Sequence, residues 1–116
     1  MSNQDSANIR GFNYRAPRFS TNFHFVISIE ANQEQTWATC TDISEDGLGA
    51  ELPEDLPADA QVTLLLVLPG GNVPLELGAS VEYRRGHRHG FAFKYTSDAQ
   101  RQKIQAFLKS LGTPMP

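Results

Sequence analysis

The fold is decided by residues 36–52, with the sequence TWATCTDISEDGLGAEL. Within residues 36–43, every second side chain faces the same way: Trp37, Thr39 and Thr41 alternate with Ala38, Cys40 and Asp42. This period of two is typical of a β-strand. After Ser44, the residues Glu45, Asp46 and Gly47 are a turn signal, and residues 48–52 have the composition of a short second strand. The stretch therefore predicts a strand, a turn and another strand.

Strand signals continue on both sides of this stretch. In residues 23–29, every second side chain is a phenylalanine or an isoleucine, which indicates one buried face. Residues 62–68 are apolar apart from Thr63, as expected of a strand in the middle of a core. A Pro-Gly-Gly-Asn turn over 69–72 is expected to bring the chain back as an antiparallel partner. The further strands are predicted over residues 23–29, 62–68, 73–81 and 89–95.

The chain ends in a helix signal. Ser97 and Gln100 have the spacing of a capping box, and an apolar stripe follows at helical spacing. Gly112 and a nearby proline are expected to end the helix. Many short strands followed by one helix predict an all-β fold with one helix: a six- to seven-stranded antiparallel barrel with a C-terminal amphipathic helix. One domain is expected over residues 10–111, with a flexible tail over 1–9 and a C-terminal tail over 112–116.

Composition limits the function. The 116 residues suit one domain, and the longest apolar run is too short to cross a bilayer. A single cysteine excludes an internal disulfide, and we expect a cytoplasmic protein. The net charge of −3 argues against a protein that coats duplex nucleic acid. Residues 10–20 nevertheless form a basic arm, whereas residues 45–59 carry only acidic charges, and this contrast favours a compact anionic ligand.

Two motifs carry a resemblance to a known family. Asp42, Ser44 and Gly47 fit the pattern Asp/Asn-x-Ser-x-x-Gly at the point where a strand enters a turn. Residues 89–93, HGFAF, are similar to a last barrel strand of the form Gly-x-x-Phe. Together with the basic arm and the final helix, this order of elements resembles the PilZ domain family over about residues 10–111.

The resemblance implies a binding function and not an enzyme. Members of this family typically bind cyclic di-GMP, a bacterial second messenger, and pass the signal to an effector protein. No cofactor, no metal and no membrane insertion are expected. An arginine fork suits a phosphate or the edge of guanine, and an aspartate accepts from the N–H donors of guanine. The ligand-binding residues implied are Tyr14, Arg15, Arg18, Asp42, Ser44 and Gly47.

The arm departs from the family pattern, and this leaves alternatives open. The family usually has two arginines four residues apart, but aligning Arg18 with the second places Tyr14 at the first, with Arg15 one position late. A second hypothesis is therefore a PilZ-like adaptor that binds no nucleotide. A third is a small barrel that binds single-stranded nucleic acid, which the acidic body disfavours. Asp42 and Ser44 also suit turn formation alone.

Three other features have plain structural interpretations. Arg84, Arg85 and Arg88 are expected at a solvated hairpin tip, with a secondary phosphate contact as the alternative. The histidines at 87 and 89 share a strand side, but two are too few for a typical zinc site. Cys40 has no evident basic partner, so an inert thiol is expected.

Overall fold

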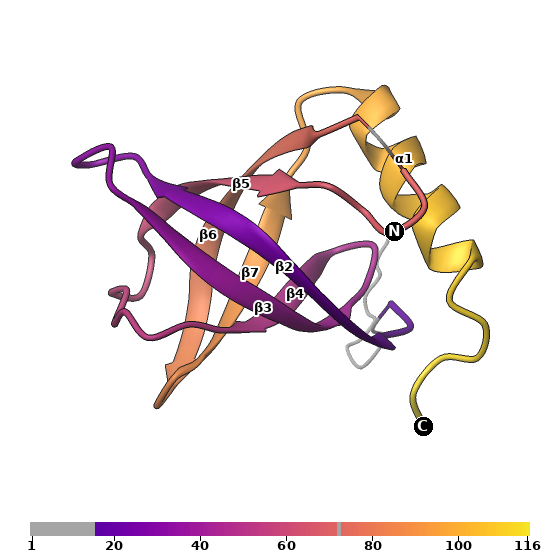
Figure 1. Ribbon diagram of the computed structural model, residues 1–116, viewed down its shortest axis with the longest axis horizontal. Helices are drawn as coiled ribbons and strands as arrows, with labels where there is room; N and C mark the ends of the chain where they lie inside the picture. Colours follow the sequence, from indigo (N-terminus) through magenta and orange to yellow (C-terminus); the bar gives the residue numbers. More distant parts are fainter. Residues whose placement is uncertain (1–15, 72) are drawn as a thin grey trace, which may run out of the picture.

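The structure, a computed structural model, describes residues 16–71 and 73–116 (Figure 1). Within them, six antiparallel strands close into a barrel in the order β2-β3-β4-β7-β6-β5. One helix follows the last strand, and Figure 1 shows it beside one end of the barrel. The predicted fold class is confirmed, with six strands. The elements are β2 (Phe19–Ile29), β3 (Gln35–Ile43), β4 (Gly47–Glu51), β5 (Gln61–Leu66), β6 (Leu75–Arg85), β7 (Arg88–Lys94) and α1 (Asp98–Lys109).

The core follows from the alternation that the sequence shows. In β2, Phe23, Phe25 and Ile27 are buried, as expected, while the residues between them face outward. This strand begins at Phe19, four residues before its predicted start, because Phe19 pairs with Ile43 across a register shift in the β2–β3 ladder. The last two residues of the predicted arm, Phe19 and Ser20, therefore belong to β2.

Strand β5 differs from its prediction. Its apolar run was expected to be buried throughout, but only Val62, Leu64 and Leu66 are buried, and Leu65 is half-buried. The reason is the closed barrel: a strand in one layer has a single inward face, so every second apolar side chain must point outward. The prediction of a strand with both faces in the core was wrong.

The hairpin between β6 and β7 is longer than predicted. Strand β6 extends to Arg85, which pairs with Arg88 in β7. Only Gly86 and His87 remain as the turn, and Gly86 has a φ of 60°, a conformation that glycine adopts without strain. The polar residues expected in a turn are thus mostly strand residues, and their side chains are directed by the sheet.

The N-terminal cap of helix α1 and its packing against the barrel are close to what the sequence predicts. The Ser97 hydroxyl accepts from the backbone N–H of Gln100 at 3.3 Å. The Gln100 side chain accepts from the backbone N–H of Thr96 at 2.7 Å, one residue earlier than in a standard capping box. Phe107 meets Phe23 edge-to-face at a centroid distance of 5.8 Å, which fixes the helix against the core. None of the helical residues described forms a stretch long and apolar enough to span a membrane.

Candidate functional site

Asp42, near the end of β3, is the centre of the site. Its carboxylate is buried, with a residue exposure of 4%. Arg18 donates to Oδ1 through Nε at 2.9 Å and through Nη2 at 2.5 Å. Arg88, from β7, donates through Nη2 to the other oxygen, Oδ2. The carboxylate is therefore inside the barrel wall, while the two arginine side chains, each about two-fifths exposed, reach the surface.

Opposing effects set the acidity of Asp42. Burial raises the pKa of its carboxyl, because desolvation disfavours the charged form. Hydrogen bonds and charge from Arg18, together with the charge of Arg88, lower the pKa and outweigh burial. The net pKa lies below the ordinary value, so Asp42 is ionised at neutral pH. It holds two cations in place.

We expect this ion-pair cluster to make stability depend on pH at the acid end. A carboxyl whose pKa is lowered by folding stabilises the fold above its unfolded pKa of about 4, and this contribution is lost as the pH falls through the lowered folded pKa. Urea unfolding of Asp42→Asn should therefore show less stability than wild type at pH 7 and a smaller difference at pH 3. Asp59→Asn, an exposed carboxylate in a backbone conformation that asparagine tolerates, is the control. If wild type and Asp42→Asn differ in stability by the same amount at pH 3 and at pH 7, the pKa of Asp42 is not lowered by folding.

Ser44 serves both the turn and the site. Its backbone N–H donates to the carbonyl of Gly47 at 2.8 Å, and its hydroxyl accepts from the N–H of Asp46 at 3.1 Å. Arg18 Nη1 lies 3.4 Å from the same hydroxyl, a long hydrogen bond. Turn formation and contact with the arm are thus compatible functions of one side chain.

Gly47 is explained by a close approach of two strands. A Cβ at this position would lie 2.0 Å from the carbonyl oxygen of Phe91 in the paired strand β7. Only glycine lets the turn and β7 come this near. Gly49 has a related role, since a Cβ there would lie 2.8 Å from Oδ2 of Asp42. Without a Cβ at these two positions, the backbone of β4 can lie close to β7 and to the Asp42 carboxylate.

A cavity of about 330 Å³ opens beside this cluster. Such a volume is at the small end of the range for small-molecule sites, so a dinucleotide would extend beyond it. Tyr83 borders the cavity, and its ring covers Gly90 so closely that a Cβ there would lie 2.1 Å from a ring carbon. Its walls come from β3, β4, β6, β7 and both ends of the described chain: Arg18, Asp42, Asp46, Gly47, Leu48, Glu82, Tyr83, Arg88, Gly90, Phe91, Ala92 and Met115.

The structure brings together four of the six site residues that the sequence predicts: Arg18, Asp42, Ser44 and Gly47. Tyr14 and Arg15 lie outside the described residues. The C-terminal tail also reaches this region, because the N–H of Met115 donates to the carbonyl of Arg18 at 2.7 Å.

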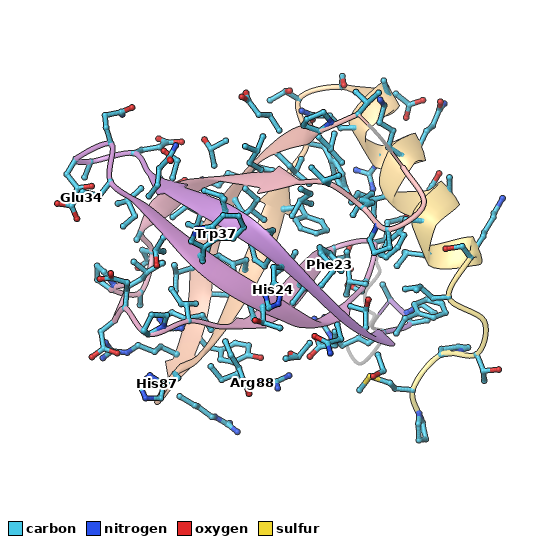
Figure 2. All side chains as sticks on the ribbon, in the orientation of Figure 1. Phe23, His24, Glu34, Trp37, His87 and Arg88 are labelled. Atoms are coloured by element: carbon cyan, nitrogen blue, oxygen red, sulfur yellow. The ribbon has the colours of Figure 1, made fainter. Side chains whose placement is uncertain are left out.

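Sequence reasoning did not assign Arg88 and Tyr83 to the site. Arg88 lies at the hairpin tip as expected, in the residue pair that flanks the two-residue turn, but its guanidinium also reaches the Asp42 carboxylate. Figure 2 shows His87 at the tip and Arg88 extending away from it. Arg84 instead lies 3.8 Å from Asp55, and Arg85 is exposed. The signal that finds Arg88 is register: in β4 and β7, Gly49 pairs with Gly90, and Arg88 lies two residues from Gly90 on the same strand face.

The remaining candidates have structural roles. His89 is fully buried and accepts from the backbone N–H of Leu56 at 3.2 Å. No cluster of three or more metal-binding side chains occurs in residues 16–71 and 73–116. Burial, followed by the nearby charge of Asp42, raises the pKa of the Cys40 thiol to about 12, which fits the expectation of an unreactive thiol.

The sequence pattern described as the PilZ domain matches residues 13–110, nearly the whole chain. Among curated proteins, none matches the sequence significantly.

Several solved structures share the fold. The PilZ domain of CeSA from a cellulose-synthesizing bacterium has a TM-score of 0.67 at 17% identity, covering 83% of this chain and 98% of that one. The K. pneumonia MrkH complex with c-di-GMP has a TM-score of 0.70 at 18% identity, covering 87% of this chain and 53% of that one. The PilZ domain of YcgR from Escherichia coli, with c-di-GMP, has a TM-score of 0.66 at 18% identity, covering 86% and 92%. At these identities the likeness is one of fold.

Proposed function

Because the chain belongs to the PilZ domain family, we propose that it is a receptor for cyclic di-GMP that passes the signal to an effector protein. The observation that carries the proposal is the meeting of Arg18, Asp42 and Ser44 beside one cavity. A cationic fork at the surface and a rigid polar turn beneath it suit a small, doubly charged ligand. Two similar folds, MrkH and the YcgR domain, are complexes with c-di-GMP.

Within this proposal, Asp42 positions the arginines. Its carboxylate is almost fully buried and already accepts from both guanidinium groups, so guanine has little access to it. An arginine has five N–H donors, and a carboxylate contact leaves others free. Arg18 and Arg88 therefore make the ligand contacts, and Asp42 fixes the direction of their forks.

Arg88 supplies a second cation for the ligand. The arm has Tyr14 where the family pattern has its first arginine. Arg18 is therefore the only arm residue that aligns with an arginine of that pattern. Arg88 approaches the same carboxylate from β7, on the barrel side of the site. Two guanidinium groups bound to one aspartate are suited to the two phosphates or to a phosphate and a guanine edge. Tyr14 and Arg15, which lie outside the described residues, are the other ligand contacts proposed for the arm.

Isothermal titration calorimetry with cyclic di-GMP tests the function directly. We expect binding in the micromolar range or tighter, since several hydrogen bonds to charged groups of about 1.5–3 kcal/mol each exceed the free-energy cost of association. Linear pGpG, which has the same bases without the closed ring, is the control ligand and should bind more weakly. Absence of heat with folded protein at concentrations well above micromolar would reject the receptor function.

The altered arm favours one competing function, a PilZ adaptor that acts through protein contacts alone. In that case, wild type shows no binding and Tyr14→Arg creates it. If wild type already binds, and Tyr14→Arg changes the affinity only a few-fold, the adaptor without ligand is excluded. The same calorimeter experiment therefore separates the two functions.

A further inference from the structure

Three neighbouring strands form an outward surface with an unusual composition. Residues 22–28 of β2, 35–41 of β3 and 61–66 of β5 contain no lysine, arginine, aspartate or glutamate, although a fifth of the chain is charged. The outward side chains of these three segments are called the neutral face below. They are a continuous surface, because β2 pairs with β3 on one side and with β5 on the other.

An apolar row crosses the middle of the neutral face. Val26 pairs with Trp37 in β3 and with Leu65 in β5, so the three side chains lie side by side. Trp37 is 68% exposed, while Val26 and Leu65 are half-buried. Figure 2 shows Trp37 and His24 following one another along these strands. An exposed tryptophan at the centre of an uncharged surface is typical of protein interfaces, where aromatic side chains are enriched and charged ones depleted.

We propose that the neutral face is the interface of a weak, two-fold symmetric homodimer of this chain. Charge identifies the partner. Two copies with a net charge of −3 each repel one another through most of their surfaces, but not through a face without charged residues. A lipid surface is a poorer partner, since membrane-binding faces carry lysine and arginine beside their apolar side chains.

The size of the face indicates the strength of the dimer. Three strand segments about 4.8 Å apart and about 20–23 Å long present on the order of 300 Å² per copy. Two such faces bury on the order of 600 Å², which is below the size of a standard stable interface. The dimer should therefore form at high micromolar protein and dissociate on dilution.

Dimerisation through this face leaves the ligand cavity open. The residues that line the cavity come from other strands or from inward-facing positions, and none belongs to the neutral face, as Arg18, Tyr83 and Arg88 illustrate. The proposal thus goes beyond cyclic di-GMP binding, and a protein that fails to bind the nucleotide can still dimerise.

Two measurements on the full chain test the proposal. Sedimentation equilibrium from about 5 µM to about 500 µM should show a concentration-dependent rise in mass towards a dimer. Trp37 is the only tryptophan, so its fluorescence reports this surface alone, and its emission should shift to shorter wavelength over the same range. A monomer at every concentration with constant emission would overturn the proposal.

Two matched variants locate the interface. Trp37→Glu places a charge in the face of each copy and should raise the dissociation constant about 30-fold or more. Val73→Glu changes an equally exposed apolar residue, at 68%, in the β5–β6 connection outside the face, and should leave it unchanged. Both positions are exposed, so both variants should fold. If Val73→Glu weakens the dimer and Trp37→Glu does not, the neutral face is not the interface.

Discussion

Replacing Arg18 with alanine is expected to weaken cyclic di-GMP binding about 100-fold or more, because at least two hydrogen bonds between charged groups of about 1.5–3 kcal/mol each are lost. The side chain combines three properties that few residues of this chain share: a planar fork, a fixed direction set by Asp42, and a surface that is two-fifths exposed to ligand. Calorimetry measures the loss directly. Arg18→Lys keeps the charge but not the fork, so its affinity should lie between those of wild type and Arg18→Ala.

The matched control for this effect is Arg85→Ala. Arg85 is an exposed arginine of β6 that lies outside the cavity lining, so its removal subtracts the same charge from the protein without touching the site. We expect a change in affinity of less than about threefold, the size of a distant electrostatic effect at physiological salt. Equal losses in the two variants would mean that net charge, and not the Arg18 fork, governs binding.

The barrel was predictable because its determinants are local. Alternation of apolar residues in β2, the turn at residues 45–47 and the stripe in α1 each depend on positions a few residues apart. The error in β5 came from the closure of the barrel. The sequence of β5 does not reveal that Leu65 faces outward, since an apolar run has no internal sign of which side the barrel encloses.

The site was predictable only as far as its motif extends. Asp42, Ser44 and Gly47 occur within six residues, and the arm before β2 pointed to Arg18. Arg88 lies 46 residues after Asp42, and its approach depends on the register of β7 against β4. Register is a property of the assembled sheet, so one sequence alone does not place this arginine.

The same contrast between local motif and assembled sheet applies to the glycines, and it leads to the largest expected effect on stability. Gly47→Ala should lower the free energy of unfolding by about 3 kcal/mol or more, at the upper end of overpacking effects. The new Cβ would lie 2.0 Å from the carbonyl oxygen of Phe91, and this neighbour is backbone in a paired strand. A flexible side chain would move aside cheaply, whereas here β4 and β7 must separate.

Gly78→Ala is the control that separates this clash from a general cost of altering a strand glycine. Gly78 also lies within a paired strand, but the nearest atom to its added Cβ is the carbonyl oxygen of Lys94 at 3.8 Å, an ordinary contact. Urea unfolding should show a change within about 1 kcal/mol, of either sign, because alanine restricts the unfolded chain and fits the folded one. If Gly47→Ala loses as little stability as Gly78→Ala is expected to lose, the glycine of the Asp-x-Ser-x-x-Gly motif is not required by its closeness to β7. Its place in the motif would then follow from contact with the ligand, and Gly47→Ala would reduce cyclic di-GMP affinity without a comparable loss of stability.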